Sequence, residues 1–94
     1  PNSNSLDEVA GFEINGYPNP TNDLFNINYV VPGVENNATL TMTNSVGQVI
    51  KVIALGGNEG RVQIPTSTMA EGMYFYYITN GANQSSTKKV MVTK

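Results

Sequence analysis

An all-β fold is predicted because apolar and polar residues alternate with a period of two along several short runs of the chain. Clusters of Gly, Pro and Asn separate these runs at intervals of roughly 8–12 residues, and no segment has the 3.6-residue period of a long amphipathic helix. The 94 residues suit one domain with one modest core. We therefore expect about seven strands arranged as an antiparallel, Ig-like β-sandwich of two layers.

The first half of the chain contains the first four predicted strands. Residues 1–11 are rich in Asn and Ser and are typical of a flexible linker, so the folded domain is expected at residues 12–94. Phe12–Ile14 is a short strand that ends before Tyr17-Pro18-Asn19-Pro20, because proline lacks the N–H that a ladder needs. The next strands are expected at residues 25–31, 38–43 and 49–55, with Gly47 placed to take a positive φ in the turn between the last two.

The second half contains three more predicted strands, at residues 61–64, 73–78 and 87–93. Residues 65–72 have no clean period, so we expect them to cross between the layers with one helical turn after Thr66. Asn80-Gly81 is a hairpin signal, although the connection to the last strand is longer than a two-residue loop.

Composition argues against several classes of function. Charged residues make up 13% of the chain and the net charge is -2, which disfavours nucleic acid as a partner. The absence of His and Cys removes the usual general base, the thiol nucleophile and the commonest zinc ligands. The carboxylates of Asp23, Glu35, Glu59 and Glu71 lie in separate predicted loops, which does not favour a metal site or an acid–base pair. We expect no enzyme activity, no cofactor and no small-molecule substrate.

No segment of the sequence is a secretion signal or an apolar run of about 20 residues. If the protein is exported, we therefore expect this chain to be one part of a larger protein whose secretion signal lies elsewhere.

Four motifs follow one another along the chain. They are Tyr17-Pro18-Asn19-Pro20 with Asn22-Asp23 behind it, the strand-turn-strand of Leu40–Ile50 with Gly47-Gln48-Val49, the Gly72-Met73-Tyr74 step within Met69–Ile78, and Lys88-Lys89-Val90-Met91-Val92. Together they resemble the type A C-terminal sorting domain of the type IX (Por) secretion system of Bacteroidetes. The resemblance covers residues 12–94, and it departs from the family's pattern at Gly16, at Thr43-Asn44 and at Gln48.

The resemblance implies a function in protein export. Such a domain folds in the periplasm, is recognised by the type IX outer-membrane machinery, and carries its upstream cargo across the outer membrane to the cell surface or medium. A surface sortase then usually removes it, and the cargo is released or joined to anionic lipopolysaccharide. The residues that carry recognition by resemblance are Tyr17, Pro18, Asn19, Pro20, Gly72, Tyr74, Lys88, Lys89, Val90 and Val92.

The most aromatic predicted strand, residues 73–78, is apolar on both faces. Tyr74, Tyr76 and Ile78 are expected in the core, which leaves Met73, Phe75 and Tyr77 on the outer face. Three interpretations of these side chains are open. They are ordinary partly exposed residues, or the amino-terminal segment around Phe12 and Ile14 covers them. Otherwise they form an interface, with the translocon or with a second copy in a homodimer. Exposed aromatics also suit an alternative function, an Ig-like adhesive or carbohydrate-binding module. Lys88 and Lys89 protect a strand edge or dock on an acidic surface.

Overall fold

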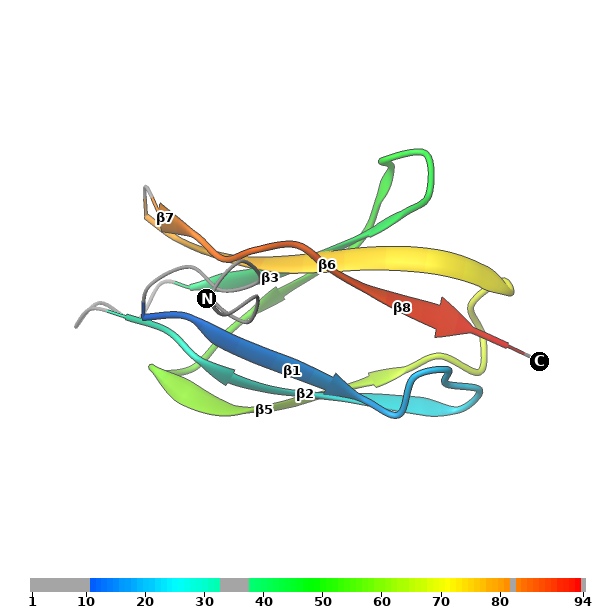
Figure 1. The fold of residues 1–94 in the computed structure, drawn as a ribbon, viewed down its shortest axis with the longest axis horizontal. Coiled ribbons are helices and arrows are strands. Elements are labelled where there is room, and N and C mark those ends of the chain that lie inside the picture. Colours follow the sequence, from blue (N-terminus) through cyan, green and yellow to red (C-terminus); the bar gives the residue numbers. More distant parts are fainter. Residues whose placement is uncertain (1–10, 33–37, 82, 94) are drawn as a thin grey trace, which may run out of the picture.

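The chain forms a β-sandwich of two antiparallel sheets (Figure 1), seen in a computed structural model that describes residues 11–32, 38–81 and 83–93. The strands are β1 (Glu13–Tyr17), β2 (Leu24–Val30), β3 (Thr39–Asn44), β4 (Val49–Ala54), β5 (Glu59–Pro65), β6 (Gly72–Asn80), β7 (Asn83–Gln84) and β8 (Lys88–Val92). One sheet has the order β1-β2-β5, and the other has the order β4-β3-β6 with both β7 and β8 pairing with β6. The predicted all-β sandwich is confirmed.

The core lies between the two sheets and takes alternate side chains from the long strands. Phe25 and Ile27 of β2 face Leu40 and Met42 of β3, and all four are at most 1% exposed. The rings of Phe25 and Tyr76 meet edge to face with centroids 5.5 Å apart, which joins β2 of one sheet to β6 of the other. This alternation is the two-residue period seen in the sequence, with each apolar set turned towards the opposite layer.

The described residues contain eight strands where about seven were expected. The additional strand is β7, whose two residues pair with Thr79 and Asn80 across the expected hairpin at Asn80-Gly81. Gly81 takes a φ of +65° there. The helical turn expected after Thr66 is instead a simple turn, in which Met69 N–H donates to Thr66 O over 3.1 Å.

The β3–β4 hairpin projects beyond the body of the sandwich, at the top of Figure 1. Gly47 takes a φ of +89° in its turn, as predicted. The Asn44 side chain holds the turn, since its Oδ1 accepts hydrogen bonds from the backbone N–H groups of Val46 (3.1 Å) and Gln48 (2.9 Å). A register shift between Met42 and Thr43 follows, which marks a β-bulge at the base of the turn.

The first ten residues of the predicted linker lie outside the described residues, and Gly11 forms a turn immediately before Phe12. Across the described ranges, no helix is long and apolar enough to cross a membrane.

Candidate functional site

Two of the four sequence motifs meet in space, although about seventy residues separate them. Tyr17 ends β1, and the residues that follow it, Pro18-Asn19-Pro20, lie beside the last strand, β8. Thr21 and Val92 form a parallel β-bridge at this point. The contact joins the three-stranded sheet to the outer side of β8.

The side-chain amide of Asn19 bonds to the backbone of β8 as a neighbouring strand would. Its Nδ2 donates to Lys89 O (3.3 Å), and its Oδ1 accepts from Met91 N–H (3.1 Å). The backbone continues the same pattern, since Thr21 N–H donates to Met91 O (2.9 Å) and Thr93 N–H donates to Thr21 O (2.8 Å). These groups lie on the side of β8 that faces away from β6. We call this arrangement of Asn19–Thr21 on β8 the closed edge.

A buried pair of threonines anchors the closed edge to the core. Thr21 is 1% exposed and Thr66 is fully buried. Their hydroxyl oxygens lie 3.2 Å apart, and Thr21 Oγ1 also donates to Leu24 O over 3.2 Å. Thr66 N–H donates to Asp23 O over 2.7 Å. Because buried hydroxyls need partners, this network fixes the segment that carries Asn19.

Tyr17 points the other way, onto the outer surface of the three-stranded sheet. Its ring is 37% exposed, and its hydroxyl accepts a hydrogen bond from Asn28 Nδ2 over 3.4 Å. The hydrogen bond from the Arg61 guanidinium, with a smaller effect from Asn28, lowers the pKa of Tyr17 below its usual range. The first motif therefore places an exposed aromatic ring on one side and a clamp for β8 on the other.

Gly16, a departure from the family's pattern, is required by the packing of two rings. A Cβ atom at this position would lie 2.2 Å from Phe25 Cζ and 2.5 Å from Tyr76 Oη. Burial raises the pKa of Tyr76 to about 12, although the backbone hydrogen bond from Gly16 acts in the opposite direction. Phe25 and Tyr76 occupy the space that a side chain at residue 16 would need.

The Gly72-Met73-Tyr74 step has an internal structural function. Gly72 opens β6 with a φ of +153°, a conformation that side chains rarely adopt. Tyr74 is 7% exposed, and its hydroxyl donates to Ala70 O over 2.6 Å. That hydrogen bond holds the connection between the sheets against the start of β6.

The outer face of β6 is only partly covered. Burial of Tyr74, Tyr76 and Ile78 follows the alternation expected for β6, and their neighbours Met73, Phe75 and Tyr77 are half-buried. The segment around Phe12 and Ile14 does not cover these three residues. Both side chains are buried in the core instead, because Ile14 pairs with Tyr29 in the three-stranded sheet.

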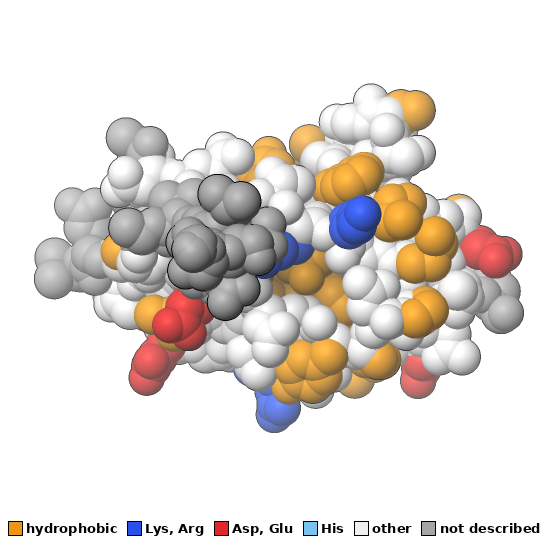
Figure 2. Space-filling model, viewed as in Figure 1, with side chains coloured by type: hydrophobic (Ala, Val, Ile, Leu, Met, Phe, Trp, Pro, Cys, Tyr) orange, Lys and Arg blue, Asp and Glu red, His pale blue; other side chains and the backbone are white. Residues whose placement is uncertain are grey.

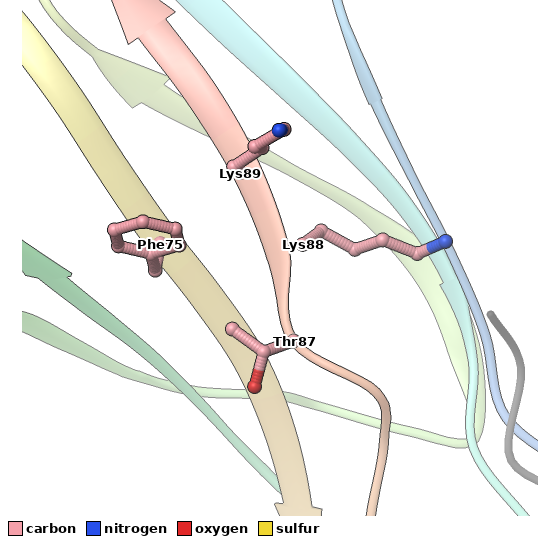
Figure 3. A pocket seen from close by; sticks show the side chains of 4 residues that line it. All are labelled: Phe75, Thr87, Lys88 and Lys89. Carbon is pink, nitrogen blue, oxygen red and sulfur yellow. The ribbon is translucent and has the colours of Figure 1, made fainter.

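Phe75, Thr87, Lys88 and Lys89 line an open hollow beside β8 (Figure 3). Lys88 is half-buried and Lys89 is exposed. Figure 3 shows both lysine side chains extending away from the Phe75 ring, so they do not converge on one ligand position. In the described part of the chain, no group of three or more His, Cys, Asp or Glu side chains is placed to hold a metal ion.

Two features of the surface were not predicted. One is the clamp function of Asn19, which carries no signal in a local pattern. The other is the apolar surface of β4, where Val49 and Val52 are 54% and 60% exposed. The run Val49–Leu55 is apolar at almost every position, and that pattern is a signal that could have revealed the exposed face.

The fold is a small β-sandwich, and residues of its first motif cover the edge strand β8 that carries its last motif. The chain belongs to the family described as the secretion system C-terminal sorting domain, whose profile matches residues 15–93. It is a C-terminal sorting signal of the type IX secretion system, which implies interaction with that machinery and export across the outer membrane. No curated protein matches the chain.

Proposed function

We propose that the domain is a folded export signal of the type A class. The outer-membrane machinery recognises its three-dimensional structure in the periplasm. The domain then carries its upstream cargo to the cell surface or medium without chemistry of its own. The observation that carries this proposal is the closed edge, where the first and last motifs of a sorting domain meet through Asn19 and Met91. A short unstructured tag would need no such closure between residues so distant in sequence.

The exposure of the recognition residues divides them into two groups. Tyr17, Pro18, Asn19, Pro20 and Lys89 are exposed, whereas Tyr74, Val90 and Val92 are buried and Gly72 and Lys88 are intermediate. Exposed and half-buried side chains reach the surface and are available for direct contact with the machinery. The buried ones act by holding the fold, so their substitution affects export through stability.

The half-buried stripe of Met73, Phe75 and Tyr77 extends the exposed group on the outer face of β6. Met91 of β8 pairs with Met73, which continues the apolar surface towards the closed edge. An apolar surface beside a basic side chain suits a protein partner. We propose that the machinery binds this side of the domain, around β8 and the outer face of β6.

The test is an export assay in a host with an intact type IX system. The whole chain is fused behind a periplasmic reporter, together with a Phe75→Thr/Tyr77→Thr variant and a Lys89→Ser variant. We expect the parent fusion to reach the surface or medium, and both variants to be exported less while their melting temperatures fall by only a few degrees. Retention of the parent fusion in the periplasm, with a known sorting domain exported in parallel, contradicts the proposal.

Removal by a surface sortase is proposed to fall within or upstream of residues 1–11. Phe12 is 3% exposed and β1 begins at Glu13, so the backbone after residue 11 is engaged in the fold. Proteolysis prefers extended and accessible backbone. Amino-terminal sequencing of the released domain tests this, and a new amino end beyond Phe12 contradicts it.

An adhesive or carbohydrate-binding module is the alternative function, favoured by the partly exposed rings of Phe75 and Tyr77. Sugars stack on such rings in many binding sites. Titration of the isolated chain with soluble oligosaccharides separates the two functions, because a sorting domain is expected to show no saturable binding.

A further inference from the structure

The edge strands of the two sheets are protected to very different degrees. Exposed edges present unpaired N–H and C=O groups, and proteins usually protect them with charge, proline or a covering segment. In the three-stranded sheet, β1 starts at exposed Glu13 and runs into Pro18, while β5 carries exposed Glu59 and Arg61 and ends at Pro65. In the five-stranded sheet, Asn19–Thr21 covers β8.

The edge strand on the other side of the five-stranded sheet, β4, has neither a proline nor a covering segment among the described residues. Its neighbour among the described strands is β3, and its one charged residue is Lys51. Four of the six large hydrophobic side chains that are exposed in the described residues lie in this hairpin, namely Val46, Val49, Ile50 and Val52. Figure 2 shows hydrophobic side chains along the projecting hairpin. We call β4 the open edge.

Alternate residues of the open edge direct their backbone N–H and C=O groups away from β3, where another strand could bond to them. Leu55 N–H donates to Ala38 O over 2.9 Å, which directs the polar groups of alternate residues towards β3. The N–H and C=O groups of Val52 and Ala54 therefore point away from β3. Val52 is 60% exposed on the outer face of the sheet, so a strand that pairs here would bury apolar surface as well as satisfy the backbone.

We propose that the occupant of the open edge is the open edge of a second copy, paired antiparallel about a two-fold axis through Val52. This register places Val52 opposite its own copy and Ile50 opposite Ala54, so the exposed apolar side chains cover one another. Lys51 lies opposite Ile53, which keeps the two lysines from facing each other directly. A closed two-fold interface leaves no second β4 edge free for further growth.

Because β4 carries a single charge, nothing in it selects a partner of opposite charge, whereas its apolar sequence is self-complementary in this register. This interface is separate from the proposed recognition surface around β8, because β4 and β8 lie at opposite edges of the five-stranded sheet. Self-association and export can therefore be measured and can fail independently.

Sedimentation equilibrium of the whole chain over a range of concentrations tests the proposal. We expect a monomer–dimer equilibrium that Val52→Lys weakens about tenfold or more, because it places two like charges at the two-fold axis. Val46→Lys, the same change at the exposed hairpin tip, is the matched control and should alter the dissociation constant by less than about twofold. An equal mixture of Val52→Lys and Val52→Glu chains should recover the dimer as a mixed pair.

A crosslinking experiment reports the register. The chain has no Cys, so Val52→Cys introduces a single thiol. Opposed residues in a hydrogen-bonded antiparallel pair have Cα atoms about 5.5 Å apart, within reach of a disulfide. We expect mild oxidation to crosslink Val52→Cys chains much faster than Val46→Cys chains.

Three results would overturn the proposal: a parent chain that stays monomeric at millimolar concentration, equal weakening by Val52→Lys and Val46→Lys, or equally fast crosslinking at both positions. Should Val52→Lys fail to fold by circular dichroism, Val52→Thr takes its place, since threonine keeps strand propensity and removes apolar area.

Discussion

The five-stranded sheet ends in two edges that are treated in opposite ways. At β8, Asn19 and the backbone of Thr21 bond to the outer groups of Lys89, Met91 and Thr93. At β4, Val49, Ile50 and Val52 are exposed beside backbone groups that have no such cover in the described residues. The closed edge joins the first and last motifs, whereas the open edge shares only Val49 and Ile50 with the second motif. The motif residues at β8 therefore serve an intramolecular closure, and we proposed a second copy as the occupant of the open edge.

At the closed edge, buried apolar side chains stabilise β8 more than the hydrogen bonds on its outer side do. Val90 and Val92 are at most 1% exposed on the inner face of β8, and burying each contributes on the order of 1.5–3 kcal/mol. Each hydrogen bond on the outer side contributes only about 1 kcal/mol. Burial thus holds β8 in the sandwich, while the Asn19 clamp fixes its register and removes a free edge.

Deleting residues 90–94 should have the largest effect, because it removes both buried valines and Met91, which bonds to Asn19 and Thr21. The apolar loss alone is about 3–6 kcal/mol, comparable with the whole stability of a small domain. We expect a chain without a cooperative thermal transition by circular dichroism and without export in the fusion assay. A truncated chain that still melts cooperatively and is exported shows that β8 is dispensable.

Gly16→Ala tests the packing beneath the first motif. The added Cβ would lie 2.2 Å from the ring of Phe25 and 2.5 Å from the hydroxyl of Tyr76, so these side chains must move. Overpacking of this kind costs about 3 kcal/mol of unfolding free energy, measured by urea denaturation. Phe25→Leu in the same chain should recover part of that loss, because it vacates the space that the new methyl group needs. Full stability of Gly16→Ala alone contradicts this account.

Alkaline pH should destabilise the same region through Tyr76. Its folded-state pKa is raised to about 12, so between about pH 10 and 12 the unfolded chain binds fewer protons than the folded chain. Stability therefore falls as pH rises through this window, by about 2–3 kcal/mol at pH 12. Tyr76→Phe should flatten the dependence relative to the parent. Parallel pH profiles for the two chains would show that Tyr76 is not the responsible group.

The sequence predicted those parts of the molecule that depend on local periodicity. Strand alternation correctly places Tyr74, Tyr76 and Ile78 in the core, and Gly47 takes its positive φ because the hairpin turn demands it. The clamp of Asn19 on Met91 was not predictable in this way, since it joins residues 72 positions apart. β7 was missed because Asn83 and Gln84 carry no apolar pattern at all.

The open edge was missed for a different reason. An apolar pattern on both faces marks a strand but does not say whether neighbours cover it. The same pattern occurs in β6, which lies between β3 and β8, and in β4, which lies at the end of the sheet. As a result Phe75 is half-buried while Val52 is 60% exposed. Strand order, which periodicity does not encode, separates the two cases.

Asn19→Ala should have a modest effect, because it removes two exposed hydrogen bonds that water replaces in part. We expect a loss of about 1 kcal/mol in urea denaturation and faster hydrogen exchange at the Met91 amide. Asn19→Asp keeps the acceptor for Met91 N–H and loses the donor to Lys89 O. Its free energy of unfolding should therefore lie between those of the parent and of Asn19→Ala. Unchanged exchange at Met91 in Asn19→Ala would show that the side chain is not a clamp.

The smallest effect is expected from Val52→Thr on the open edge, and its value lies in comparison with Val90→Thr on the closed edge. The two substitutions are chemically identical, both positions lie in strands, and threonine suits a strand about as well as valine. Val90 is 1% exposed, so its new hydroxyl would be buried among apolar side chains at a cost of about 1–3 kcal/mol. Val52 is 60% exposed, so the hydroxyl of a threonine there stays hydrated and the stability of the monomer should change by less than about 0.5 kcal/mol.

Urea denaturation at micromolar concentration measures this monomer value. At high concentration, where the parent pairs through β4, Val52→Thr should lose stability relative to the parent. Equal losses at Val52 and Val90 in the dilute chains would mean that β4 is covered within the monomer, and the contrast between the two edges would then be wrong.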